Sequence, residues 1–445
     1  MRLGTSCTIA VLSLLPIAVP LASQSPRDTA VVLASPGAAA RIAAERNAGV
    51  SMARLRADQA EARIGEERSH LLPSLDVRLS DGRRTFNTAA FGLEFPAAPG
   101  EPPLFDPDGQ VEGPVRNVDL RGRLDIPVLD LAAMAKVRAA RAEHAASSTA
   151  VDQSADAAAL FGAERYVQAV RAGALVRARQ ADSSLAAELL VIARERLAAG
   201  VGVGLEVTRA ESRLATARTQ LISARTDRDR LRLVLLRALA LPLDTRLVLP
   251  DSLAPMPNEQ HAVSLGRRAD LRTAALAVDA AERDAAAIRA ERLPSVSLFG
   301  TDGQTGLDYG RWLNTYDYGV MVSMPLFDGF RRSHRLAEQR AVVEELELRR
   351  RDLSERAELE LRSAELAQAA AAERLESALT ALRLAELEVS QARERLDVGA
   401  GESIDVIEAA LGLNQARTGV IDALAAEHMA VVEIAAATGT ISELP

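Results

Sequence analysis

The amino-acid sequence predicts a mainly α-helical protein with a small β part, built by internal duplication from long antiparallel helical hairpins. Three observations lead to this prediction. Segment 193–224 recurs in the second half of the chain as segment 392–423, and both copies begin with ARERL and break at glycines. After each break the apolar residues recur in alternating steps of three and four, which is the 3.5-residue seam of a coiled coil. Four short segments alternate apolar and polar residues as β-strands do.

Composition excludes several classes of protein. Of the 445 residues, 26% are charged and only 3% are aromatic, which suits long, closely packed helices better than a core built on aromatic anchors. The net charge of −8 disfavours nucleic-acid binding. The single cysteine, Cys7, lies in an apolar run at the start of the sequence, so disulfides and thiolate metal sites are not expected in the mature chain.

Residues 1–24 have the features of a secretory signal peptide. Arg2 precedes an apolar run over 8–22, and small residues follow at Ala22 and Ser23. The run has only about 15 residues and contains two prolines, whereas a membrane-spanning helix needs about 20 apolar residues. We therefore expect the chain to be exported, and we expect no helix to hold it in a membrane.

The first repeat is predicted to occupy residues 25–241. In order it contains a helix over 36–71, a strand over 75–80, a long loop over 82–116, a strand over 118–126, a helix over 129–197, a glycine tip at 199–204 and a return helix over 205–239. The first helix should end before Pro73, and Pro127 should close the second strand. The loop contains six prolines and has no periodicity.

A proline-marked linker is predicted over 242–258, and the second repeat over 259–445. This repeat contains a helix before Pro294, strands over 294–302 and 316–325, a helix over 330–396, a tip at 398–403 and a return helix that ends near residue 437. Pro294 matches Pro73, and Pro325 matches Pro127. Fewer residues separate Pro127 from Pro325 than separate Pro73 from Pro294. The difference is extra length in the first repeat's loop, between its two strands.

The four predicted strands indicate an assembly of several copies. Four strands are too few to close a barrel, but their length of about nine residues matches a membrane-spanning β-strand. Open sheet edges are not tolerated in lipid, and three copies would supply twelve strands to one closed barrel. Asp119, Arg121, Arg123 and Asp125 would then line water. Alternation alone fits a soluble sheet with one wet face equally well; the export signal, the number of strands and the helix length favour the membrane.

Two further features occur twice in the same order: a strand-ending proline in DIPVLD and SMPLFD, and a tip in RLAAGVGVGLEV and RLDVGAGESIDVIEA. With the duplication, these features resemble those of the TolC-like outer-membrane efflux proteins over residues 36–439. The resemblance implies a homotrimer in outer-membrane lipid, with a transmembrane β-barrel of four strands per protomer, twelve in the trimer. A periplasmic α-barrel of twelve helices would continue it.

The resemblance also implies a function and partners. The function is passive conduction as the exit duct of a tripartite efflux pump or a type I secretion system. The implied partners are a periplasmic adaptor (a membrane fusion protein) and an inner-membrane transporter of the RND, ABC or MFS type. The sequence does not identify the exported substrate.

The resemblance assigns a gate to the inner hairpin, where relatives carry two acids three residues apart. The matching residues are Asp405 and Glu408, which would lie on one helix face. Threefold symmetry would place six carboxylates around a narrow opening, and such a ring favours cations. Glu206 matches the acid of the outer tip. Alternatively, these acids only stabilise the first helical turn, where the helix dipole favours negative charge.

The two tips are the expected docking sites for the adaptor. The residues concerned are Arg196, Leu197, Gly200, Gly202, Arg395, Leu396, Gly399 and Gly401. In some relatives an arginine of the inner tip ties neighbouring hairpins together. Gly401 stands at that place here, which leaves the presence of such a latch open.

No motif predicts an enzyme, a cofactor site or a metal site. Residues 200–204 follow a helix rather than a strand, so their glycines do not form a dinucleotide-binding loop. The five histidines have no metal-ligand spacing, and no nucleophile motif occurs. Two non-enzymatic alternatives are a periplasmic coiled-coil adaptor, which has one hairpin between β-rich domains, and a structural envelope protein without a pore.

Overall fold

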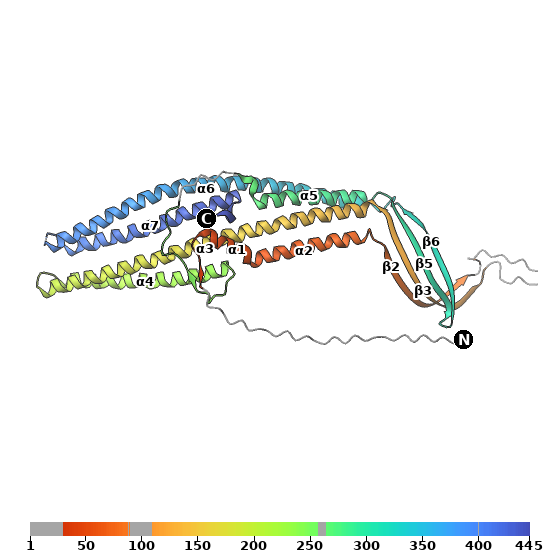
Figure 1. Ribbon diagram of the computed structural model, residues 1–445, viewed down its shortest axis with the longest axis horizontal. Helices are drawn as coiled ribbons and strands as arrows, with labels where there is room; N and C mark the ends of the chain where they lie inside the picture. The colour runs from red at the N-terminus through yellow and green to blue at the C-terminus, as the bar shows by residue number, and fades with distance from the viewer. Residues whose placement is uncertain (1–29, 88, 90–108, 257–263, 399) are drawn as a thin grey trace, which may run out of the picture.

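The computed structural model describes residues 30–445 except 88, 90–108, 257–263 and 399. The chain forms an elongated bundle of helices with a curved sheet at one end and two hairpin tips at the other (Figure 1). The main elements are α1 (Pro36–Arg46), α2 (Ala48–Ser69), β2 (Ser74–Asn87), β3 (Val111–Asp130), α3 (Leu131–Ala198), α4 (Gly204–Ala238), α5 (Ala269–Ala290), β5 (Ser295–Asp308), β6 (Arg311–Ser323), α6 (Arg331–Asp397) and α7 (Ser403–Thr438). The predicted fold class, mainly α with a small β part, is confirmed.

Both predicted long helices are present. α3 has 68 residues and α6 has 67, so each extends for roughly 100 Å at 1.5 Å per residue. α3 pairs with α4, and α6 with α7, as hairpins whose apolar seams contain Ala186, Leu190, Ala210 and Leu214 in the first and Ala385, Val389, Ala409 and Leu413 in the second. Among the described residues, no helix combines the length and the hydropathy needed to cross a membrane.

A break at Asn47 divides the helix predicted over 36–71 into α1 and α2. The backbone of Asn47 is extended (φ −60°, ψ 133°). Its side-chain oxygen accepts a hydrogen bond from the Gly49 amide at 2.7 Å, so the residue ends one helix and caps the next. The prediction of a single helix was wrong because the apolar periodicity continues across the break.

The most extensive apolar cluster of the described residues lies near the middle of the helical part. There β1 (Val31–Val32) pairs in parallel with β4 (Leu247–Val248), a pairing that the sequence analysis did not anticipate. Buried side chains of several elements surround this pair: Leu33, Ala43, Tyr166, Val170, Leu235, Leu239 and Ala425. The cluster joins the segment between the repeats to both hairpins.

β2, β3, β5 and β6 form one antiparallel sheet in that order. The strands are longer than predicted. β2 continues to Asn87, β3 already begins at Val111, and β5 and β6 meet at a tight turn near Gly310. The loop predicted over 82–116 is therefore shorter, and most of what remains lies outside the described residues. Pro127 lies inside β3 beside a register shift, where its missing amide donor is tolerated, and does not end the strand as predicted.

The alternation predicted for the strands gives the sheet two different faces. Leu79 is paired with Leu120, and one residue away Arg78 is paired with Arg121, so apolar and charged side chains point to opposite sides. The apolar face is open: Leu79 is 60% exposed and Tyr318 is 79% exposed. In a single chain, no described element covers this face.

Two glycines of α3 provide a matched test of helix packing. A Cβ at Gly162 would lie 2.7 Å from the Cβ of Ala43 and 2.9 Å from the carbonyl oxygen of Ala39, whereas nothing lies within 4 Å of a Cβ at Gly173. We expect Gly162→Ala to lower the Tm through an overpacking cost of about 1–3 kcal/mol. Gly173→Ala should raise the Tm through a gain of about 1 kcal/mol in helix propensity. Thermal unfolding followed by circular dichroism measures both, and equal shifts in the two variants would contradict the packing.

Candidate gate, docking tips and mid-helix joint

The outer tip is a tight reversal between α3 and α4. The amides of Val201 and Gly202 donate to the Arg196 carbonyl at 3.1 and 3.0 Å, and Gly200 has a φ of +75°. Glycine adopts this left-handed conformation at the end of a helix at the least cost, because it has no Cβ. A Cβ at Gly202 would lie 3.0 Å from the amide nitrogen of Leu197. Both glycines are thus needed for the reversal that the sequence predicts.

The inner tip reverses the chain between α6 and α7. The Ala400 amide donates to the Arg395 carbonyl at 2.8 Å, and a Cβ at Gly401 would lie 3.1 Å from the Arg395 Cβ. The Arg395 guanidinium donates to the Ala400 carbonyl oxygen at 3.5 Å. Arg395 therefore closes its own turn. Gly399, the remaining residue of the predicted docking set, lies outside the described residues.

Asp405 and Glu408 lie at the start of α7. Both side chains are exposed, whereas Val406 between them is fully buried in the hairpin. The Asp405 carboxylate accepts a hydrogen bond from the Glu402 amide at 3.3 Å, which caps the helix, and an acid there is also favoured by the helix dipole. The structure thus presents two acids to solvent and gives Asp405 the helix-start role that the sequence left as an alternative.

Glu206 has a different environment from the two acids of the inner tip. It is half-buried, and its Oε2 atom is buried without a hydrogen-bond partner among the described residues. The Nε atom of Arg196, in the other helix of the same tip, is buried and unpartnered in the same way. Glu206 and Asp405 correspond in sequence but differ in exposure, so an equal contribution to one ring of charge is not expected.

Apolar side chains that the sequence analysis did not single out surround both tips. Val201, Val203 and Leu205 are 57–69% exposed at the outer tip, and Val398 is 77% exposed at the inner tip. Leu396, in contrast, is 4% exposed and belongs to the apolar cluster that joins the two hairpins. It supports the tip from inside, and the exposed valines and leucine supply the surface that a partner could contact.

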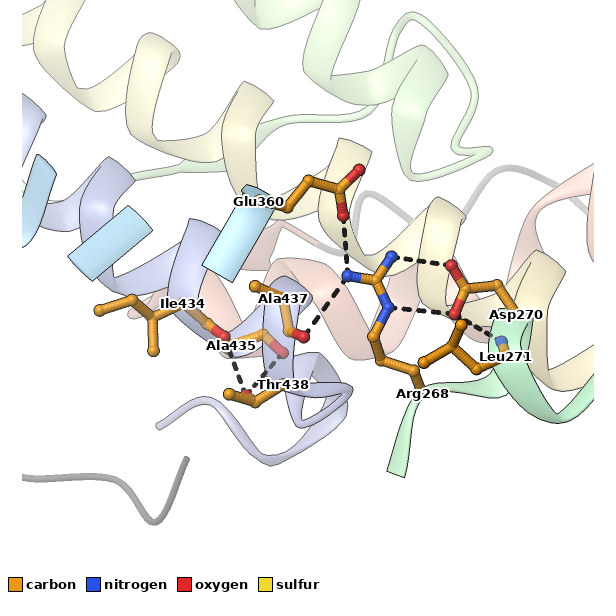
Figure 2. Close-up of polar contacts among 8 residues, drawn as sticks. All are labelled: Arg268, Asp270, Leu271, Glu360, Ile434, Ala435, Ala437 and Thr438. Atoms are coloured by element: carbon orange, nitrogen blue, oxygen red, sulfur yellow. Dashed lines mark hydrogen bonds and ion pairs between the residues drawn. The ribbon is translucent and has the colours of Figure 1, made fainter. Parts of the chain in front are cut away.

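Arg268 joins three helices near the middle of the molecule (Figure 2). It precedes α5, is 8% exposed, and donates two hydrogen bonds to Asp270 at 3.1 and 2.7 Å. Its Nη1 atom donates to Glu360 of α6 at 2.7 Å and to the carbonyl oxygen of Ala437, in the last turn of α7, at 3.5 Å. The hydrogen bond to Asp270 raises the pKa of Arg268, and the dipole of α7 favours a cation at this end. A charged side chain therefore links α5, α6 and α7.

Sequence reasoning missed this joint, although the repeat marks its position. Arg268 follows Asn47 at the same spacing by which Pro294 follows Pro73, so the two residues correspond in the repeat. They also have nearly the same backbone conformation, with φ of −62° and −60° and ψ of 123° and 133°. Asn47 caps its own helix, whereas Arg268 reaches two other helices. One arginine among many gives no signal of its partners in the sequence.

A cavity of about 590 Å³ lies beside Arg268, between α3, α6 and the end of α7. Asp156, Glu164 and Glu433 are among its lining residues. Burial, followed by repulsion from Asp152, raises the pKa of Asp156 to about 6, and burial also raises the pKa of Glu164. Among the described residues, no cluster of histidine, cysteine and acidic side chains is arranged to hold a metal ion, so these acids are not assigned as ligands.

Asp156 allows a pH-dependent test of this region. Its pKa is about 6 in the folded chain, compared with an ordinary value of 3.8, so the folded chain binds this proton more tightly. Protonation of Asp156 therefore stabilises the fold at low pH, and this contribution is lost as the pH rises through about 6. We expect Asp156→Asn to raise the Tm at neutral pH, where the buried carboxylate is charged. At a pH near 3.8, the ordinary pKa of the carboxyl group, the substitution should change the Tm little. Asp58→Asn, at an exposed acid of α2, is the control and should show no such difference. A Tm shift of Asp156→Asn that is equal at both pH values would contradict the prediction.

Comparison with known proteins gives a family and a fold. The sequence profile described as "Outer membrane efflux protein" matches residues 39–241 and 262–440. The fusaric acid resistance protein FusA of Burkholderia cepacia is 34% identical over 256 residues. That match covers 52% of this chain and 47% of FusA, so the chain is matched over about half the length of this relative.

Solved outer-membrane channels share the fold over nearly the whole chain. The CmeC channel of Campylobacter jejuni has a TM-score of 0.76 at 18% identity, with 91% of this chain and 85% of CmeC covered. VceC of Vibrio cholerae has a TM-score of 0.76 at 18% identity, with 91% and 96% covered. The open-state MtrE channel of Neisseria gonorrhoeae has a TM-score of 0.68 at 18% identity, with 91% and 88% covered. At these identities the similarity is evidence of the fold alone.

Proposed function

The chain belongs to the outer membrane efflux protein family, and from this premise we propose that three copies form one exit duct across the periplasm and the outer membrane. Membership confirms the predicted resemblance and the outer-membrane location, and the family is one of transport proteins rather than enzymes. In the proposed role the duct conducts substrate passively, as the last component of a tripartite efflux pump or a type I secretion system.

The open apolar face of the sheet, together with its two free edges, carries the proposal. β2 and β6 are the outer strands, so each has one row of backbone groups without a partner in the described sheet. Such edges are not tolerated in lipid, and pairing of β6 with β2 of the next copy would satisfy both. Three copies would close a barrel of twelve strands, with Arg121 and Asp317 on its water-filled side and Tyr318 toward lipid.

The helical part has matching free sides. The contacts among helices place α2 and α4 on one side of α3 and place α6 at the far side of α5 and α7. Both outer sides expose large apolar side chains: Met52, Leu55 and Ile222 on the first, and Leu348, Leu359 and Leu366 on the second. A second copy packed at each side would bury these residues and continue the helical wall.

The tips are the proposed contact with an adaptor, and Asp405 and Glu408 the proposed gate. The exposed apolar residues of both tips lie farthest from the sheet, where a periplasmic partner would meet the duct (Figure 1). Threefold symmetry would bring six exposed carboxylates together at the inner tips. Glu206 is half-buried and contributes less to the proposed ring.

Cargo and partner class follow from neither the fold nor the family. The relative FusA is named for resistance to fusaric acid, which makes this acid a first compound to test as cargo. An inner-membrane transporter, of the RND, ABC or MFS type, would set the specificity. The alternatives, an adaptor with one hairpin or an envelope protein without a pore, explain neither two hairpins nor a sheet with one open apolar face.

The trimer is tested by mass in detergent. We expect light scattering to give about three times the mass of the mature chain, because the sheet edges are satisfied only in a closed assembly. Leu366→Glu, on the exposed side of α6, should shift the population toward monomer. Glu365→Gln, at the neighbouring exposed position, is the control and should leave the trimer intact. A wild-type chain that is monomeric in mild detergent would exclude the barrel.

The gate is tested by ion selectivity in planar bilayers. Asp405→Asn/Glu408→Gln removes both charges and retains a side-chain oxygen at residue 405 that can accept from the Glu402 amide. We expect the ratio of cation to anion permeability to fall by about threefold or more, because the ring of carboxylates is lost. Glu206→Gln should have the smaller effect. If the double variant keeps wild-type selectivity and wild-type block by multivalent cations, these acids only cap the helix.

A further inference from the structure

We propose that a basic groove between α3 and α4 binds small amphipathic organic anions as they pass along the duct. The groove lies in the hairpin of α3 and α4 (Figure 1) and has a volume of about 650 Å³, which is typical of small-molecule sites. Its lining includes Arg165, Arg171, Leu175, Arg179, Arg230 and Leu231. The proposal rests on the trimeric duct proposed above and deepens it, because it assigns a chemical class of cargo to named residues.

Arginines dominate the charge of the groove. Four arginines line it, and Asp227 is the one acid among the described lining residues. Two of the arginines are balanced by acids that do not line the groove. Arg171 pairs with Asp422 of α7 at 2.6 Å, and Arg179 pairs with the buried Asp182 at 3.2 Å. The other two arginines are therefore the ones available to an anion.

These two, Arg165 and Arg230, have donors to spare. The guanidinium of Arg165 lies 4.6 Å from the centre of the Phe161 ring, and its Nη1 atom donates to Gln168 at 2.7 Å. The neighbouring acid in the chain, Glu164, lines a different cavity. Arg230 is exposed and has neither a hydrogen bond nor an ion pair with any described residue. A guanidinium carries five N–H donors in a planar fork that fits a carboxylate, so both side chains suit an organic acid.

The groove also offers apolar surface beside these charges. Leu175 of α3 and Leu231 and Val234 of α4 line it, and all three are half-buried. Sites for small molecules combine an apolar lining with a few polar groups that fix the orientation of the ligand. An inorganic anion would leave the apolar side chains without a contact. The ligand that fits both parts is a small carboxylic acid with an aromatic or aliphatic body.

The groove opens on the face of α3 that is turned away from α1. Ala163 and Val170 are buried against α1 and the pair formed by β1 and β4. Arg165 and Ala172 follow these two residues by two positions, which is about 200° around a helix of 3.6 residues per turn. The lining residues of α3 therefore lie on the side opposite to this covering layer.

The dimensions of the proposed trimer place this open face inside the duct. Twelve helices spaced by about 8–10 Å form a ring about 30–38 Å across between opposite axes, and subtraction of one helix diameter leaves an opening of about 20–28 Å. Three copies of the layer formed by α1, β1 and β4, each about 10 Å thick, would fill that opening. The layer thus belongs on the outside, and three grooves would line the lumen at one level.

The groove lies behind the proposed gate and does not compete with it. Its residues of α4, from Thr219 to Val234, lie roughly 22–45 Å from the start of that helix at 1.5 Å per residue. The carboxylates of Asp405 and Glu408 would act on ions at the closed tips. The arginines of the groove would act on cargo that a transporter has already delivered into the open duct.

Equilibrium dialysis of radiolabelled benzoate against the purified trimer tests the groove. Benzoate has one carboxylate and an apolar ring. Benzamide has the ring without a charge, benzylammonium has the ring with a positive charge, and acetate has the carboxylate alone. The variant Arg165→Gln/Arg230→Gln removes the two unpaired guanidiniums. Arg218→Gln is the control, at an exposed arginine of α4 that does not line the groove.

We expect benzoate to bind the wild-type trimer, and we expect the double variant to bind it about tenfold or more weakly, because charge-assisted hydrogen bonds are lost. Arg218→Gln should bind as the wild type does, and the three comparison compounds should displace benzoate poorly. Failure of the wild-type trimer to bind benzoate would overturn the proposal, as would equal binding by the double variant. Displacement by acetate as effective as that by unlabelled benzoate would show only a general attraction of anions, and would also overturn it.

A thiol in the groove tests its place in the duct. Ser223 is an exposed lining residue, and the mature chain is expected to have no cysteine, because Cys7 lies in the predicted signal peptide. We expect a bulky thiol reagent to cause a stepwise loss of single-channel conductance in Ser223→Cys and no loss in Arg218→Cys. Unchanged conductance of labelled Ser223→Cys would place the groove outside the lumen and overturn the proposal. Benzoate binding by a chain that is monomeric in mild detergent would instead contradict the duct, and with it the position of the groove in a lumen.

Discussion

The alternation of side chains along the ladder of β2, β3, β5 and β6 is the constraint on which the rest of the structure depends. A slip of one residue in register would move every apolar side chain to the charged face. In the observed register Leu79 is paired with Leu120 and Arg78 with Arg121, so apolar and charged side chains stay on separate faces of the sheet. Strand order also matches helix order: β2, β3, β5 and β6 are connected directly to α2, α3, α5 and α6, and these helices contact one another in the same order. The helical wall is therefore arranged by the sheet.

Duplication explains the likeness of the two hairpins, and one difference between the repeats lies near the middle of the molecule, where each return helix ends. Ala240 and Gly439 correspond in the repeat, because the same number of residues separates them as separates the two tips. Each follows a return helix, and each has a positive φ, of 51° and 72°. A Cβ at Gly439 would lie 2.9 Å from the amide nitrogen of Arg268, so glycine allows α7 to end directly against the start of α5. At the corresponding break in the first repeat, Asn47 only caps the next helix. Arg268 instead donates hydrogen bonds to groups of α5, α6 and α7.

The long helices could be predicted to within a few residues because their apolar seam has no break and contains no proline. The helix predicted over 129–197 is α3, Leu131–Ala198. The ends of the strands could not be predicted. β2 continues through Gly82, Arg83 and Arg84, where the alternation of apolar and polar residues that marks a strand is absent. The tip glycines were recognisable because a reversal requires them. The different exposure of Glu206 and Asp405 was not, because it depends on how each tip packs rather than on the residues themselves.

Each hairpin is held together by an apolar seam, but much of the contact between the hairpins is polar. Arg171 of α3 pairs with Asp422 of α7 at 2.6 Å, and both side chains are more than 40% exposed, so this pair contributes about 0–1 kcal/mol to stability. Asp182 lies buried between the hairpins, and burial raises its pKa despite a hydrogen bond from Arg179 at 3.2 Å, so its charge is incompletely compensated. Apolar contact between the hairpins occurs near the tips, around Leu189. It recurs near the middle of the molecule, where buried side chains of α3 and α7 share two apolar clusters that include Tyr166 with Ala425 and Ala163 with Val432. Between these two apolar regions the hairpins are joined mainly by polar contacts, such as those of Arg171 and Asp182. A partner that moved only the ends of the hairpins would have to disturb the cluster around Leu189, while the clusters near the middle would keep the hairpins together.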